Sequence, residues 1–160
     1  MIPYFQNDNN WDAYRNELMD WIGTPYRHMT NIKKRGADCA LFIGNAMKNT
    51  GFLGEVPFRE YSRGWHLHQN QSIVLESYLS GSKKLIKGLH FITMDGCDEY
   101  MRGDIFLISL VPSGIIHHSA VCLNEKSMIH CIQPRGVQIS TITNWWKRHI
   151  KITARIMMEN

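Results

Sequence analysis

The chain has 160 residues, of which 44% are hydrophobic and 20% charged, and its formal net charge is +4. This composition is ordinary for a globular protein and predicts one domain over residues 1–160 with its own core. No apolar stretch approaches the roughly 18 residues of a membrane span, which excludes a membrane-spanning class. The N-terminus lacks the basic and apolar regions of a signal peptide, so we expect synthesis in the cytoplasm and, for any action outside the cell, delivery by other machinery.

The first half of the chain is predicted to be helical. Apolar residues recur there at helical spacing, with cap residues before them and glycines after them. The expected elements are a helix over Trp11–Ile22 capped by Asn10, a helix from about Cys39 to Lys48, a long surface loop over Phe52–Gln71, and a helix over Ile73–Gly81 capped by Ser72.

After about residue 88 the pattern changes to short runs of strand-forming residues separated by turns. Helices first and an antiparallel five- or six-stranded meander second predict an α+β domain. The expected strands are Ile105–Val111, His118–Leu123, Met128–Ile132, Val137–Ile139 and Lys151–Met157, with one helical turn over Thr143–Arg148.

Cys39 is the most informative residue of the chain, because it follows Gly36 and Asp38 and begins an apolar helical run. The first turn of a helix has unpaired N–H groups and the positive end of the dipole, which favour negative charge. We therefore expect a lowered pKa and an enriched thiolate, the nucleophilic form of cysteine. The same N–H groups, including that of Cys39, are expected to stabilise an oxyanion.

His118 and His130 are the candidates for a base and for a group that orients it. If the two strands that carry them form a hairpin, one register pairs Ala120 with His130 and Cys122 with Met128. The two histidines are then diagonal neighbours on one face, within reach of a shared hydrogen bond. In this register His118 takes the thiol proton and His130 fixes its tautomer.

The other cysteines predict neither a disulfide framework nor a metal ribbon. The register above places Cys122 and Cys131 on opposite faces, which disfavours a bridge between them. The same register places the nearby histidines and cysteines on both faces of the sheet. A metal site needs three or four ligands that converge on one point, so this arrangement disfavours one. We expect no metal and no organic cofactor.

Three groups of aromatic residues can each be interpreted in two ways. His117 points away from His118 by strand alternation and is the alternative base. Trp65, His66 and His68 form either one lip of a cleft or an exposed loop. Trp145–Trp146 is either a core plug or a pair that stacks on sugar rings.

Basic residues cluster at Lys33–Arg35, Lys83–Lys87 and Lys147–Lys151. These clusters are typical of a solvated surface, with attraction to an anionic partner such as cell wall as the alternative. No basic stripe is interleaved with aromatic residues, so we expect no nucleic-acid partner.

The motifs together resemble the NlpC-type cell-wall cysteine peptidases of the papain-like superfamily. The resemblance spans roughly residues 10–157, and the long segment before Asp38 is most similar to the phage and prophage branch. The residues that carry it are Trp21–Tyr26 with Arg35–Ile43 around the nucleophile, Arg102–Leu107 before the first core strand, His118–Leu123 for the base, Met128–Cys131 for the third residue, and Gly136–Val137, Trp145 or Trp146, Arg148 and Arg155 near the end.

The resemblance implies a papain-like fold that hydrolyses peptidoglycan stem peptides, with the γ-D-glutamyl–diamino acid bond as the usual target. It places the catalytic residues at Cys39, His118 and His130. It further implies substrate-binding roles for Tyr26, beside the nucleophile, and for Asp38. A phage tail or a secretion machine is the delivery partner it suggests, with the cell wall or periplasm as the site of action.

Two departures from the family pattern matter. Ala40 follows the nucleophile where many members have a serine that holds a free substrate amine, so recognition of a free N-terminal L-alanine is not expected from this position. The glycine stretch before the cysteine is shortened to Arg35–Gly36. The alternatives are the same triad acting on another amide, a thioester or a lipid ester, and a non-catalytic tail or assembly module.

Overall fold

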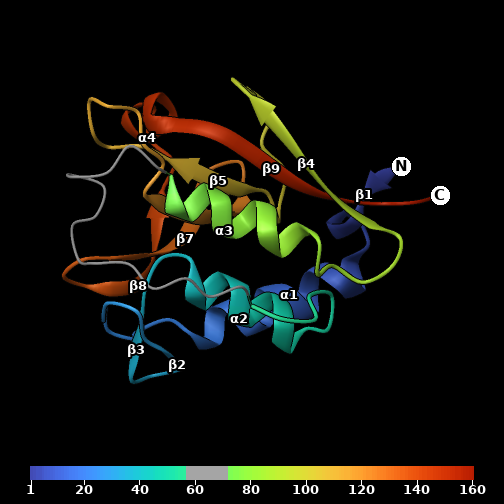
Figure 1. Ribbon diagram of the computed structural model, residues 1–160, viewed down its shortest axis with the longest axis horizontal. Helices are drawn as coiled ribbons and strands as arrows, with labels where there is room; N and C mark the ends of the chain where they lie inside the picture. The colour runs from blue at the N-terminus through green and yellow to red at the C-terminus, as the bar shows by residue number, and fades with distance from the viewer. Residues whose placement is uncertain (57–71) are drawn as a thin grey trace.

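The computed structural model describes residues 1–56 and 72–160, and Figure 1 shows their arrangement. Most of the expected loop over Phe52–Gln71 lies outside these residues, and so do Trp65, His66 and His68. The helices are a 3-10 turn at Tyr4–Gln6, α1 (Asp8–Asp20), α2 (Leu41–Asn49), α3 (Ile73–Ser82) and α4 (Asn144–His149). The strands are β1 (Ile2–Pro3), β2 (Asn31–Ile32), β3 (Gly36–Ala37), β4 (Leu89–Asp95), β5 (Ile105–Ile108), β6 (His118–Asn124), β7 (Ser127–Ile132), β8 (Gly136–Thr141) and β9 (Ile150–Met158).

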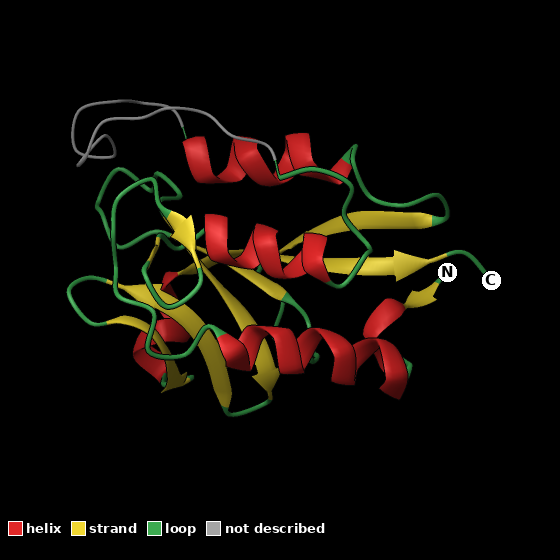
Figure 2. Cartoon of the chain, turned by 90° about the horizontal axis from the view of Figure 1, so that it is seen from below, coloured by secondary structure: helices red, strands yellow, loops and turns green. Residues whose placement is uncertain are grey.

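The expected α+β class is confirmed, and within the described residues the main sheet is antiparallel and seven-stranded. Strands β5 to β8 form the predicted meander, and β9 returns to pair with β5. The sheet exceeds the predicted size because β4 and the two-residue β1 also pair with β9. Figure 2 shows α1, α2 and α3 as one layer against the sheet.

The predicted register of the central hairpin is confirmed. Ala120 pairs with His130 and Cys122 pairs with Met128. Cys122 packs in the cluster on one face of the sheet, and Cys131 packs in the cluster on the other. Both thiols are free.

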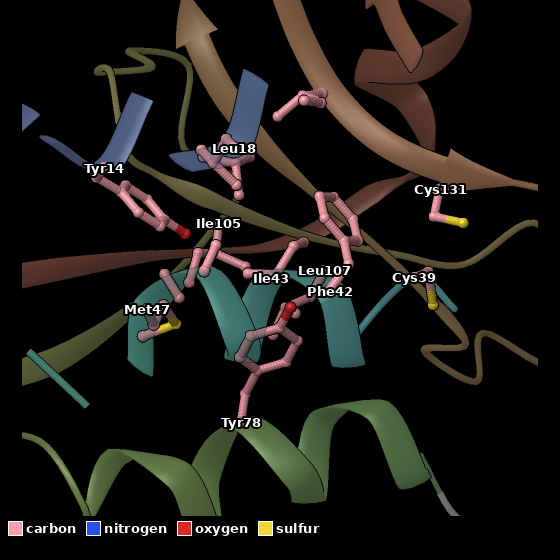
Figure 3. Close-up of a cluster of buried hydrophobic side chains, with 14 of the residues drawn as sticks. Tyr14, Leu18, Cys39, Phe42, Ile43, Met47, Tyr78, Ile105, Leu107 and Cys131 are labelled. Carbon is pink, nitrogen blue, oxygen red and sulfur yellow. The ribbon is translucent and has the colours of Figure 1, made fainter. Parts of the chain in front are cut away.

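The helices pack on the sheet through a large apolar cluster. Figure 3 shows Tyr14 and Leu18 of α1, Phe42 of α2 and Leu107 of β5 in it, all almost completely buried. Alternate residues of the strands, among them Phe106, form a second cluster on the opposite face. None of the helices in the described part of the chain is long and apolar enough to span a membrane.

Two helix starts and one capping interaction differ from the prediction. α1 begins three residues earlier than Asn10 suggested, because the Asn7 side chain accepts the N–H of Asn10. α2 begins at Leu41 instead of Cys39, which leaves Cys39 in the preceding turn. Ser72 occupies the N-cap position of α3, but its side chain makes no capping hydrogen bond, since its hydroxyl accepts the N–H of Ile116.

Candidate active site

Cys39 lies in the turn between β3 and α2, and the start of β6 holds it there. The Ser119 hydroxyl donates to the Cys39 carbonyl oxygen at 2.8 Å, and Tyr78 of α3 donates to the Ser119 hydroxyl at 3.0 Å. The Cys39 thiol donates to the His117 carbonyl oxygen at 3.7 Å. Contacts on either side of His118 therefore fix the nucleophile candidate against the strand that carries the base candidate.

The predicted histidine pair is present. His118 Nε2 lies 2.9 Å from His130 Nδ1, and the two side chains are 7% and 0% exposed. One ring donates this hydrogen bond and the other accepts it. Nε2 of His118 faces His130, so Nδ1 is the ring nitrogen that this hydrogen bond does not use. Cys39 packs in the cluster on the helix face of the sheet, whereas His118 shares the other strand face with Cys122. Contact between the Cys39 thiol and His118 Nδ1 therefore stays a prediction.

His117, the alternative base, is used elsewhere. Its Nε2 accepts the backbone N–H of Leu110 at 3.0 Å, next to the turn that leads into β6. Its carbonyl oxygen accepts the hydrogen bond of the Cys39 thiol. His117 therefore contacts the nucleophile candidate through its backbone, and His118 as the base stays a prediction.

Asp38 is buried and caps α2. One carboxylate oxygen accepts the N–H groups of Ala40 at 3.1 Å and Leu41 at 2.8 Å. Asp38 therefore already binds two of the N–H groups that were expected to stabilise an oxyanion. The remaining candidate donor is the N–H of Cys39. Substrate contact by Asp38 stays a prediction.

The expected lowered pKa of the nucleophile is wrong for this arrangement. Burial, followed by the Asp38 carboxylate, raises the pKa of the Cys39 thiol. Burial, His130 and His117 lower the pKa of His118 well below its ordinary value, and burial lowers the pKa of His130 to about 4. At neutral pH these directions favour a neutral Cys39 thiol and neutral His118 and His130 rings, because desolvation penalises the charged form of each group.

Tyr26 lies close to Cys39 in the fold. It is half-buried and forms a parallel bridge with Ala37, two residues before the nucleophile. The Pro25 carbonyl oxygen accepts the Ala37 N–H at 3.0 Å, which holds the segment in place. The structure therefore brings Tyr26 to the turn that holds Cys39, and its contact with substrate stays a prediction.

Sequence reasoning missed two polar neighbours of the histidine pair, both on β8. Ser140 Oγ lies 2.8 Å from His130 Nε2, and Gln138 Nε2 donates to that oxygen at 3.3 Å. Alternation along the expected strand at Val137–Ile139 was the available signal, because it places residues 138 and 140 on one face.

Trp146 supports the histidine pair from α4. Its ring centroid lies 6.1 Å from that of His118 and 5.2 Å from that of His130. Trp145 contacts Trp146 edge-on and is 46% exposed. The inner tryptophan thus fits the predicted plug, whereas the outer one reaches solvent. Among the described residues, no three His, Cys, Asp or Glu side chains form a group that could hold a metal ion.

Comparisons with solved structures identify the fold. The chain is similar to an NLP/P60-family, lipoprotein-like protein of Staphylococcus aureus subsp. aureus Mu50 (TM-score 0.58, 19% identity), covering 96% of this chain but only 43% of that protein. It is similar to the NlpC/p60 domain of the peptidoglycan hydrolase SagA (TM-score 0.56, 18% identity), covering 92% and 98% of the two chains. It is also similar to the peptidoglycan hydrolase RipB of Mycobacterium tuberculosis (TM-score 0.59, 14% identity), covering 99% and 70%.

No protein-family model and no curated protein matches the sequence. The similarity to solved structures comes with low sequence identity, and it establishes the fold of the chain. The chain has the α+β fold of NlpC/P60 peptidoglycan hydrolase domains, with N-terminal helices packed on an antiparallel sheet.

Proposed function

We propose that the protein is a cysteine hydrolase of peptidoglycan stem peptides, with the γ-D-glutamyl–diamino acid amide as the bond cleaved. The observation that carries the proposal is the hydrogen bond between His118, at the start of β6, and His130 on β7, with the next residue of β6, Ser119, bonded to the Cys39 carbonyl oxygen. The fold shared with peptidoglycan hydrolase domains supports the same substrate class.

The reaction begins with a turn of the Cys39 side chain. The thiol leaves the His117 carbonyl oxygen and gives its proton to His118 Nδ1, while the sulfur attacks the amide carbonyl carbon. The Cys39 N–H stabilises the oxyanion. His118 then protonates the leaving amine, the C–N bond breaks, and an acyl-enzyme remains on Cys39.

Water completes the cycle. His118 removes a proton from the water molecule, and the water oxygen attacks the thioester carbonyl carbon. The C–S bond then breaks, and His118 returns the proton to the sulfur of Cys39. His130 holds the His118 ring in one orientation throughout, through the 2.9 Å hydrogen bond. The sequence of steps uses no metal and no cofactor.

A lipid substrate for the same triad would need an apolar cleft for an acyl chain. An apolar cavity does lie behind the nucleophile, between α2 and α3, lined by Ala40, Leu41, Tyr78 and Phe91 among others. This cavity is the feature that would suit the alternative lipid substrate, and a hydrolysis screen with thioester and ester substrates tests that alternative.

Delivery to the cell wall by a phage tail or a secretion machine belongs to the same proposal. Its support is the sequence resemblance around the nucleophile and the substrate class proposed above. The partner surface is left to experiment.

The test is mass spectrometry of purified muropeptides incubated with the protein. We expect wild-type protein to release fragments whose masses identify the bond, and Cys39→Ala to release none. Cys131→Ala is the matched control, because Cys131 is buried nearby and its thiol donates to the Ala37 carbonyl oxygen.

Equal product release by wild type and Cys39→Ala would contradict the proposed nucleophile. Absence of products from wild type would contradict the substrate class. A hydrolysis screen with thioester and ester substrates would then distinguish a different hydrolase from a non-catalytic module.

A further inference from the structure

Ser140 lies at the outer end of the histidine pair. The register places Gln138 opposite His130 and Ser140 opposite Met128, so Gln138 and Ser140 share one face of β8. Ser140 Oγ approaches His130 Nε2 to 2.8 Å. The His130 ring is therefore held at both nitrogens, by His118 at Nδ1 and by Ser140 at Nε2.

The two neutral rings allow two proton arrangements, because each has one donor and one acceptor nitrogen. In the first, His118 Nε2–H donates to His130 Nδ1, and His130 Nε2–H donates to Ser140 Oγ. The Nδ1 of His118 is then free of a proton. In the second, every donor and acceptor is exchanged, and His118 Nδ1 carries a proton that prevents it from acting as a base for Cys39.

We infer that Ser140 is a positioning residue that accepts the Nε2–H of His130 and thereby keeps His118 Nδ1 unprotonated. This inference rests on the proposed function, because base action by His118 requires the first arrangement. Gln138 holds the Ser140 hydroxyl oxygen in place for this hydrogen bond, because the Gln138 side-chain amide donates to Ser140 Oγ at 3.3 Å. Ser140 is half-buried, so water can receive its own hydroxyl proton.

The tautomers can be observed without any substrate. Long-range proton–nitrogen NMR on ¹⁵N-histidine-labelled protein distinguishes Nδ1–H from Nε2–H rings, with His118→Gln and His130→Gln variants to assign the signals. We expect Nε2–H on both rings in wild type and in Ser140→Thr, which retains the hydroxyl. We expect a reduced Nε2–H population of His130 in Ser140→Ala.

Two spectral results would overturn the inference. One is an Nδ1–H tautomer of His130 in wild type. The other is a His130 tautomer population that Ser140→Ala leaves unchanged.

Kinetics give a second readout. Ser140→Ala is expected to lower kcat about tenfold, the effect of one hydrogen bond, with KM unchanged and with recovery in Ser140→Thr. Thr141→Ala is the matched control, because it removes a hydroxyl from the opposite face of the same strand and should leave kcat unchanged. An unchanged kcat in Ser140→Ala, or an equal loss in Ser140→Thr, would contradict the inference.

The experiments distinguish a failure of the proposed function from a failure of the inference about Ser140. Wild-type protein with the expected tautomers and no hydrolysis contradicts the proposed function and supports the role of Ser140 in the histidine pair. Hydrolysis by a wild type whose His130 carries Nδ1–H contradicts the role of Ser140 alone.

Discussion

Cys39 shows how burial, together with one charged neighbour, reverses an expectation drawn from helix geometry. A helix start favours a thiolate, but here the Asp38 carboxylate occupies the first N–H groups and adds a negative charge beside the sulfur. Burial acts in the same direction. Asp38 is visible in the sequence, whereas its orientation toward Ala40 and Leu41 depends on the three-dimensional turn.

The buried thiol with its raised pKa is expected to react slowly with alkylating reagents. At pH 7.5 we expect iodoacetamide to modify the more exposed Cys97 before the buried Cys39, as measured by peptide mass spectrometry over time. A Cys97→Ala variant removes the competing site and serves as the control. Modification of Cys39 first, with a midpoint below pH 7, would show a resting thiolate–imidazolium pair and contradict the neutral site.

At the scale of elements, the register of the hairpin of β6 and β7 could be predicted because a one-residue slip would put His118 and His130 on opposite faces. β4 was missed because its residues are largely exposed and show no clean alternation. The link from Tyr78 through Ser119 to Cys39 was also missed, since it joins three elements far apart in the sequence.

Ser119→Ala tests that link between α3, β6 and the turn before α2. The change leaves the buried Tyr78 hydroxyl and Cys39 carbonyl oxygen without their partner, so we expect a loss of about 2 kcal/mol in the free energy of unfolding. Urea denaturation measures it. Ser77→Ala is the control, because that hydroxyl donates only within α3, to the Ile73 carbonyl oxygen, and an equal loss in both variants would refute the special role of Ser119.

Gly136 joins the turn after α1 to the start of β8. Its φ is +98°, and a Cβ atom there would overlap the Thr24 carbonyl oxygen, which accepts the Val137 N–H at 2.9 Å. We expect Gly136→Ala to lower the free energy of unfolding by more than about 2 kcal/mol, through backbone strain and the lost contact. Gly114→Ala, with a φ of +76° and open space around the Cβ position, should cost about 1 kcal/mol by strain alone; similar losses in both variants would show that the contact with Thr24 is unimportant.

At the scale of the whole molecule, the burial of His118 and His130 links stability to pH. His130 has an ordinary pKa of 6.5 and a folded-state pKa of about 4. Between these values the unfolded chain binds the proton and the folded chain does not, so stability rises with pH in this window. The fold class could be predicted from the sequence, but this coupling could not, because it depends on the burial of both rings.

We therefore expect the protein to lose about 3 kcal/mol of stability through His130 as the pH falls from about 6.5 to about 4. Urea denaturation at several pH values measures this loss. His130→Gln should show a shallower dependence over the same window, whatever its stability at pH 7. Parallel curves for the two proteins would contradict a buried neutral His130.

The most direct test of the central claim is the mass of the intact protein after acid quenching during reaction with a purified stem peptide. The account predicts a mass gain equal to the acyl fragment, located on the peptide that contains Cys39 and absent from Cys39→Ala. Product formation that continues in Cys39→Ala, without an adduct on any cysteine of the wild type, would contradict a mechanism through Cys39, His118 and His130.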